Sequence, residues 1–131
     1  MRQCDDPSPR ELLLAINQFN GGRWFECHET LEDLWGGEEG EMRDFYQGVL
    51  QVAVALHHWR NGNFGGAIRL LEGGTSYLRR VRPICQRVDV TDLIVAADKL
   101  REELVILGPT RMAQLAQSLI PRLQLLDEVF Q

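Results

Sequence analysis

Residues 49–56 read Val49-Leu50-Gln51-Val52-Ala53-Val54-Ala55-Leu56 and are apolar at every position except Gln51. They lie in the middle of a longer segment, residues 39–61, that has the helical period. A helix that is apolar nearly all the way round must be covered on several sides. We therefore predict a central helix over residues 39–61. Because its apolar run is too short to span a bilayer, we expect no membrane association.

The segments on both sides of this helix also have the helical period, and no segment is predicted to form a strand. Ser8-Pro9-Arg10-Glu11 predicts a capping box with Ser8 as the N-cap. Asn63 and either Asp89 or Thr91 are predicted to cap later helices. The fold class is therefore all-α: a compact bundle of five to six helices in a single domain, residues 1–131. The predicted outer helices cover residues 9–19, 23–35, 64–81, 90–107 and part of 112–119, with a loop at 82–87.

Composition places the chain among ordinary globular proteins and argues against binding to nucleic acid. The 131 residues are 44% hydrophobic and 25% charged, with a formal net charge of −5. General nucleic-acid binding normally needs a basic face, so we expect no nucleic-acid partner. Four nearby arginines are interpreted as a solvated helix end, with a patch that binds an anion or RNA as the less favoured alternative. They are Arg79, Arg80, Arg82 and Arg87.

Three cysteines, Cys4, Cys27 and Cys85, are odd in number and far apart, and they match no zinc spacing. Reduced thiols in a cytoplasm are the simplest interpretation. Cys27 lies within a helical pattern and is expected to be a small buried side chain. The first residues lack the apolar region of a signal peptide, which also favours a cytoplasmic location.

The predicted helix at residues 23–35 has an unusual face. At 100° per residue, one side combines apolar surface with an imidazole and a carboxylate. A buried Glu32 must be paired, protonated or hydrated, and His28 lies one turn before it. We expect these two side chains to form a polar pair. The side in question holds Trp24, Phe25, His28, Leu31, Glu32 and Trp35, whereas Glu26, Glu29, Thr30 and Asp33 point away.

An alternative interpretation gives the same residues a chemical role. His28-Glu29-Thr30-Leu31-Glu32 has a glutamate where a zinc-binding His-Glu-x-x-His motif has its second histidine. His28 and Glu32 could supply two metal ligands, and His57 or His58 a third from the central helix. A hydrolase that depends on a divalent metal ion is therefore one alternative function. Its catalytic candidates are His28, Glu32, Glu29 and His57, and its metal candidates are His28, Glu32 and His57.

Gln47 and Gln51 lie one turn apart in apolar surroundings on the central helix, so both need hydrogen-bond partners. We expect them to join His28 and Glu32 in one buried polar network. Gly48 is expected to let another helix approach closely, and Gly73-Gly74 to mark a kink or a second close contact.

The sequence is compatible with three functions. The first is a small helical protein that acts as a structural or interaction module, with a homodimer or an unidentified protein partner. Exposed apolar residues in the tail, such as Leu123 and Phe130, would then need cover. The second is the divalent-metal hydrolase, for which the metal would be the cofactor. The third is a small-ligand binder with a pocket lined by Trp24, Trp35 and Trp59.

Several motifs between residues 19 and 67 resemble the family catalogued as domain of unknown function 309. They are Phe19-Asn20, Trp24-Phe25-Glu26-Cys27-His28-Glu29-Thr30-Leu31-Glu32-Asp33-Leu34-Trp35, Gln47-Gly48-Val49-Leu50-Gln51-Val52-Ala53, His57 and Gly62-Asn63-Phe64-Gly65-Gly66-Ala67. Trp24 stands where the family usually has phenylalanine. The resemblance implies a compact helical bundle and no particular reaction. Helices predicted at residues 90–119 lie outside it.

Overall fold

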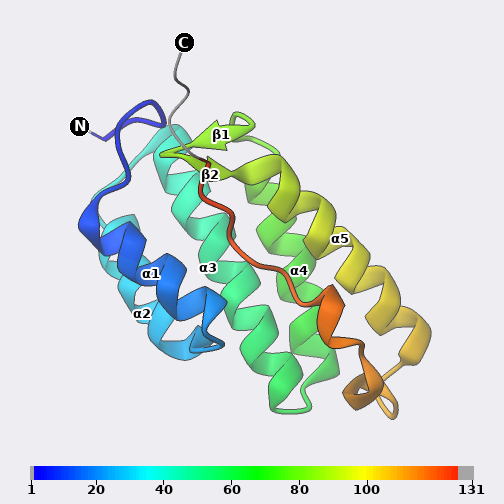
Figure 1. Cartoon of the computed structure of the whole chain (residues 1–131). Coiled ribbons are helices and arrows are strands. Elements are labelled where there is room, and N and C mark those ends of the chain that lie inside the picture. The colour runs from blue at the N-terminus through cyan, green and yellow to red at the C-terminus, as the bar shows by residue number, and fades with distance from the viewer. Residues whose placement is uncertain (1, 127–131) are drawn as a thin grey trace.

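Helix α3, Gly40–Arg60, lies at the centre of the computed structural model, which describes residues 2–126. Helices α2 and α4 pack on either side of it, α1 packs on α2, and α5 packs on α4 (Figure 1). Ten of the 21 residues of α3 are buried, as expected for a helix that is covered on several sides. The all-α fold class is confirmed. The other helices are α1 Arg10–Asn20, α2 Trp24–Trp35, α4 Phe64–Leu78 and α5 Val90–Leu107.

Helices α3 and α4 approach each other through glycines. A Cβ atom on Gly48 would lie 2.5 Å from the Leu78 side chain, and one on Gly74 would lie 3.0 Å from the Gly48 carbonyl oxygen. Neither position has room for a side chain. The predicted close contact at Gly48 is confirmed, and Gly73-Gly74 marks a helix contact within an uninterrupted α4.

The capping predictions are confirmed for two helices and wrong for one. Asn63 accepts a hydrogen bond from the Gly66 amide, and Asp89 accepts one from the Asp92 amide. Ser8 does not cap α1. Its hydroxyl instead donates to the carbonyl of Gln86, because the chain before α1 lies beside a distant loop.

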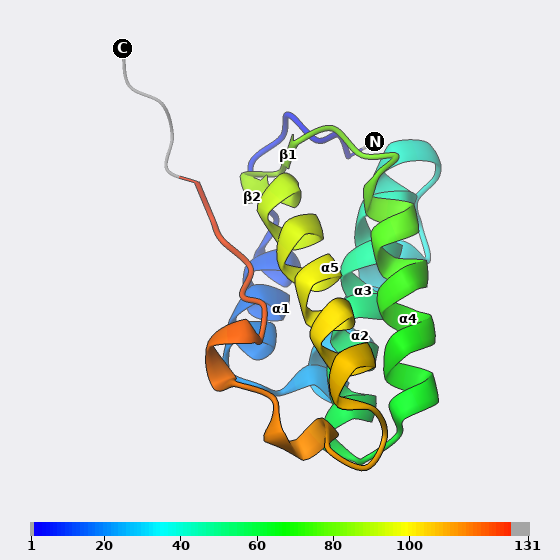
Figure 2. The same cartoon turned by 90° about the vertical axis from the view of Figure 1, so that its right-hand side faces the viewer.

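That loop corrects the prediction that the chain has no strand. Strands β1, Ile84–Cys85, and β2, Val88–Asp89, form a short antiparallel hairpin beside the start of α5 (Figure 2). Its two turn residues, Gln86 and Arg87, have φ angles of +47° and +72°. Positive φ at both positions suits a two-residue hairpin, but neither residue is the glycine or asparagine that normally announces one.

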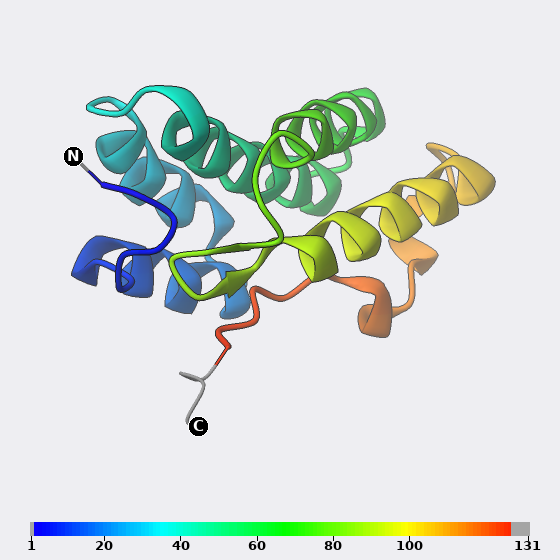
Figure 3. The same ribbon diagram turned by 90° about the horizontal axis from the view of Figure 1, so that it is seen from above.

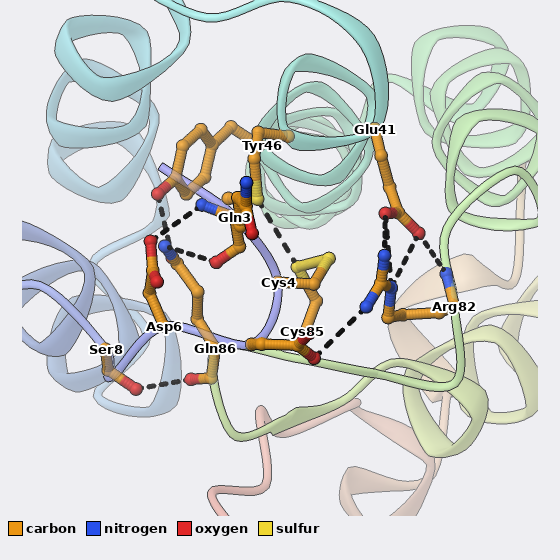
Figure 4. The surroundings of a disulfide bond; sticks show 11 residues. Gln3, Cys4, Asp6, Ser8, Glu41, Tyr46, Arg82, Cys85 and Gln86 are labelled. Atoms are coloured by element: carbon orange, nitrogen blue, oxygen red, sulfur yellow. Dashed lines mark hydrogen bonds and ion pairs between the residues drawn. A yellow bond between two sulfur atoms is a disulfide. The ribbon is translucent and has the colours of Figure 1, made fainter. Parts of the chain in front are cut away.

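Cys4 and Cys85 form a disulfide, so the prediction of reduced thiols is wrong for these two residues (Figure 4). They are 81 positions apart, and only the folded chain brings the N-terminal segment beside the hairpin. Cys27 is a free, fully buried thiol, as predicted. Burial raises its pKa from 9.0 to about 12.

The segment after α5 crosses back over the bundle towards α1 and the hairpin (Figure 3). The predicted short helix at 112–119 is two 3-10 turns, Met112–Gln114 and Gln117–Leu119. Beyond it, Leu125 pairs with Val88 in extended conformation, and the predicted role of Phe130 lies outside the described residues. Within residues 2–126, none of the helices combines the length and apolar character needed to cross a membrane.

Candidate functional site

The buried side of α2 differs from the predicted one. Trp24, Cys27, Leu31 and Leu34 face the core, whereas the side chain of Glu32 is 55% exposed. Helix α1 covers the side of α2 that carries Cys27, since Cys27 Sγ lies 3.3 Å from the Ala15 carbonyl of α1. The prediction that Glu32 is buried is therefore wrong.

His28 and Glu32 do form the expected pair, at the surface. His28 Nε2 lies 3.3 Å from Glu32 Oε2, one turn further along α2. The second ring nitrogen, Nδ1, is buried and has no hydrogen-bond partner within residues 2–126. Phe25 packs against the imidazole with ring centroids 5.7 Å apart. The pair thus lies beside an aromatic ring that is 51% exposed.

His57, on α3, also packs against Phe25. Their ring centroids are 5.5 Å apart, and the side-chain nitrogen of Asn61 is 3.1 Å from His57 Nε2. His57 Nδ1 is buried without a partner in the described part of the chain. Helices α2 and α3 therefore present a continuous surface, which we call the Phe25 strip. It consists of Phe25, His28, Glu32, His57 and Asn61.

His58 points towards the start of α4 and not into the Phe25 strip. Its Nδ1 lies 3.3 Å from the side-chain nitrogen of Asn63. Burial lowers the pKa of His58 below 6.5, and the nearby His57 and Arg69 lower it further. This histidine favours the neutral form and takes part in the connection between α3 and α4.

The other predicted site residues do not join the Phe25 strip through hydrogen bonds. Gln51 packs against the backbone of Gly73, and no hydrogen bond within residues 2–126 links Gln47 or Gln51 to His28 or Glu32. Glu29 is exposed. Across the described residues, no three His, Cys, Asp or Glu side chains gather closely enough to hold a metal ion.

A separate cleft of about 480 Å³ opens where the turn between α1 and α2 meets the end of α3. The rings of Trp24 and Trp59 meet edge to face in its wall, with centroids 6.4 Å apart. Trp59 donates a hydrogen bond from Nε1 to the Met112 carbonyl. The lining residues are Phe19, Asn20, Gly21, Gly22, Trp24, Trp59, Arg60, Gln117, Ile120, Pro121 and Arg122.

Two of the three predicted tryptophans therefore share a cleft. Trp35 does not line it, because it lies at the opposite end of α2 and packs under the Arg43 guanidinium. Arg60 and Arg122 were not predicted as cleft residues, because no local pattern in the sequence marks them. Arg122 is far from the first helix in sequence, yet it reaches the Asn20 carbonyl at 3.4 Å.

The fold and these two sites define a small all-helical bundle protein with an aromatic–polar surface on α2 and α3. Residues 12–70 match the family model described as Domain of unknown function (DUF309), so the resemblance to that family is confirmed. The Phe25 strip lies entirely within this match, whereas the cleft also uses residues 117–122 beyond it.

Two relatives share part of this sequence. The chain is 36% identical over 73 residues to the uncharacterized protein YpuF of Bacillus subtilis (strain 168), covering 54% of this chain and 42% of that protein. It is 37% identical over 46 residues to an uncharacterized protein of Aquifex aeolicus (strain VF5), covering 34% of this chain and 14% of that protein. The chain therefore spans less than half the length of either relative.

Proposed function

We propose that this protein is a helical interaction module that pairs with a second copy of itself through the Phe25 strip. The observation that carries the proposal is the exposure of Phe25, a large aromatic side chain that is 51% accessible and contacts two histidines. Aromatic residues are enriched at the centres of protein interfaces, where a polar rim surrounds them. The Phe25 strip likewise has one aromatic residue with four polar residues around it.

The position of Phe25 also suits an interface. Its ring rests on His28 of α2 and His57 of α3, so its orientation is set by both helices before any partner arrives. A side chain that is already positioned loses little conformational entropy on binding. Phe25 is therefore a suitable anchor for association.

Charge distribution favours a second copy as the partner. Helix α2 contains no lysine or arginine and exposes four carboxylates, whereas residues 45–60 of α3 contain no carboxylate. A two-fold axis near Phe25 would place the acidic side of α2 in each copy against the carboxylate-free side of α3 in the other. The carboxylates are Glu26, Glu29, Glu32 and Asp33.

The divalent-metal hydrolase receives less support from the same geometry. His28 and Glu32 supply two neighbouring ligands, but the ring of Phe25 packs against both His28 and His57. A catalytic site would also be expected in a concave pocket. The cleft is lined by none of His28, Glu29, Glu32 and His57.

Sedimentation velocity over a range of concentrations tests the proposal. The wild-type protein, purified without a histidine tag, should sediment at higher concentration as a species of twice the 15.0 kDa monomer. Phe25→Ala should remain monomeric, while Val95→Ala, which alters a 62% exposed side chain on α5, should behave as the wild type. Equal self-association of all three proteins, or none by the wild type, would contradict the proposal.

A further inference from the structure

We infer that the cleft between Trp24 and Arg122 binds a small organic anion, in which a phosphate or carboxylate group is joined to a flat ring. This site is distinct from the Phe25 strip and does not depend on self-association. The inference rests on three features of the cleft: its charge, the way Arg60 is held, and its aromatic wall.

The lining of the cleft is positively charged although the chain as a whole has a formal net charge of −5. Arg60 and Arg122 contribute to it, and no lining residue is an aspartate or glutamate. Neither arginine forms an ion pair with a carboxylate within residues 2–126, in contrast to Arg82 and Arg101, which pair with Glu41 and Glu72. Two guanidinium groups with no carboxylate partner among residues 2–126 favour an oxyanion as ligand.

Arg60 is held in place by groups that leave its charge uncompensated. Its Nη1 donates to the Gly22 carbonyl at 2.6 Å, and its guanidinium carbon lies 4.3 Å from the centre of the Trp24 ring. Gly22 has a φ of +75°, which few residues other than glycine adopt readily, so the turn can present this carbonyl. A guanidinium has five N–H donors, and those not used here remain for a ligand.

Arg122 approaches the same cleft from the C-terminal segment. Nη1 reaches the Asn20 carbonyl at 3.4 Å, and the Asn20 side chain fixes the neighbouring backbone through two hydrogen bonds with Leu123. The nitrogen of the Asn20 amide donates at 3.0 Å, and its oxygen accepts at 2.8 Å. The chain around the second guanidinium is therefore anchored to the end of α1.

The rest of the wall suits a flat, largely apolar group. Trp59, which is partly exposed, lies on it with Ile120 and Pro121, whereas Trp24 is buried beneath the Arg60 guanidinium. Rings of nucleobases and similar compounds gain stability by packing on tryptophan. A volume of about 480 Å³ falls within the range of about 300 to 1,000 Å³ that is typical of small-molecule sites.

Isothermal titration calorimetry with four probes tests this inference: adenosine 5′-monophosphate, adenosine, inorganic phosphate and indole-3-acetate. We expect saturable binding of at least one of the two ring-bearing anions, and weaker binding of adenosine and of phosphate alone. Binding of the monophosphate only would identify a phosphate ligand, and binding of indole-3-acetate only would identify a carboxylate. Binding of both would identify the oxyanion as the shared requirement.

Matched variants locate the binding. Arg60→Gln and Arg122→Gln should each weaken the bound probe about tenfold or more, because each removes charge-assisted hydrogen bonds. Arg69→Gln, an exposed residue on α4 outside the cleft, should bind as the wild type. Arg122 is exposed and lies outside the helices, so its variant is expected to fold even if Arg60→Gln does not. Absence of binding by all four probes, adenosine binding as tightly as the monophosphate, or unchanged affinity in Arg122→Gln would overturn the inference.

Discussion

The ring of Phe25 in the first turn of α2 lies against the imidazole of His57 in the last turn of α3, with centroids 5.5 Å apart. This contact joins two helices at the surface and leaves Phe25 51% exposed to solvent. Aromatic contacts of this kind contribute about 0.5–1.5 kcal/mol beyond the area they bury. The exposed part of Phe25 can contribute to a binding free energy only when a partner buries it.

The glycine contact between α3 and α4 gives a prediction about stability. Gly48→Ala and Gly74→Ala should each lower the free energy of unfolding by about 1–3 kcal/mol, because the new methyl group would overlap Leu78 or Val52. Gly65→Ala is the matched control, since a Cβ there meets nothing within 4 Å and alanine favours the helix. Urea denaturation of the three variants checks this. Equal stability of Gly48→Ala and Gly65→Ala would contradict the packing described.

The Cys4–Cys85 disulfide gives a second prediction. A cross-link between residues 81 positions apart restricts the unfolded chain and should stabilise the fold by about 4 kcal/mol. The double variant Cys4→Ser/Cys85→Ser should therefore unfold at a lower denaturant concentration than the oxidised wild type. Cys27→Ala, which alters the buried free thiol, controls for loss of a cysteine without loss of the cross-link. Unfolding of the double variant at the wild-type midpoint would show that the cross-link does not stabilise the protein.

Tyr46 and Gln86 are both fully buried, and the tyrosine hydroxyl donates to Gln86 Oε1 at 2.8 Å. Tyr46→Phe should destabilise the protein by about 1–3 kcal/mol, because it leaves a buried amide oxygen without this donor. Thermal unfolding followed by circular dichroism measures the effect. Tyr77→Phe is the control, since Tyr77 is only partly buried.

The same tyrosine predicts a dependence on alkaline pH. Burial raises the pKa of Tyr46 from 10.0 to about 12. In the unfolded chain the hydroxyl ionises near pH 10, whereas in the folded protein it stays neutral. The stability that Tyr46 contributes is therefore complete below pH 10 and declines between pH 10 and 12. Over this range Tyr46→Phe should lose less stability than the wild type, and parallel losses would contradict the assignment.

Glu32 should matter little for folding. Its side chain is 55% exposed, and exposed ion pairs contribute between 0 and about 1 kcal/mol. Glu32→Gln should therefore unfold within a few degrees of the wild type in a thermal scan. The matched variant Glu29→Gln, also exposed on α2, should behave alike. A large loss of stability for Glu32→Gln alone would instead support the buried polar network that was predicted from the sequence.

The sequence was sufficient wherever the controlling signals are local. Helix α5 runs from Val90 to Leu107 as predicted, because Asp89 caps it and Leu93, Ala97, Leu100 and Leu104 form one buried stripe. Non-local relationships could not be predicted in the same way. The disulfide and the hairpin depend on the N-terminal segment meeting residues 84–89, which no spacing announces.

The candidate sites illustrate the same limit. Periodicity placed His28 near Glu32, but only the position of α1 decides which side of α2 is covered. The cleft joins Asn20 and Trp24 to Arg122, so its lining includes residues about a hundred positions apart in the sequence. The sequence predicts on which side of a helix each side chain lies. It does not predict which other elements pack against that helix.

Isotope-filtered NMR on a mixture of labelled and unlabelled protein tests the pairing through the Phe25 strip most directly. One copy carries ¹³C and ¹⁵N, the other is unlabelled, and only contacts between copies give signals. We predict intermolecular signals from the Phe25 ring to residues of α2 and α3, and their loss in Phe25→Ala. Self-association with intermolecular signals only from other surfaces would contradict it. The absence of any signal between copies near 1 mM protein would also contradict it, because the association would then be weaker than about 4 kcal/mol.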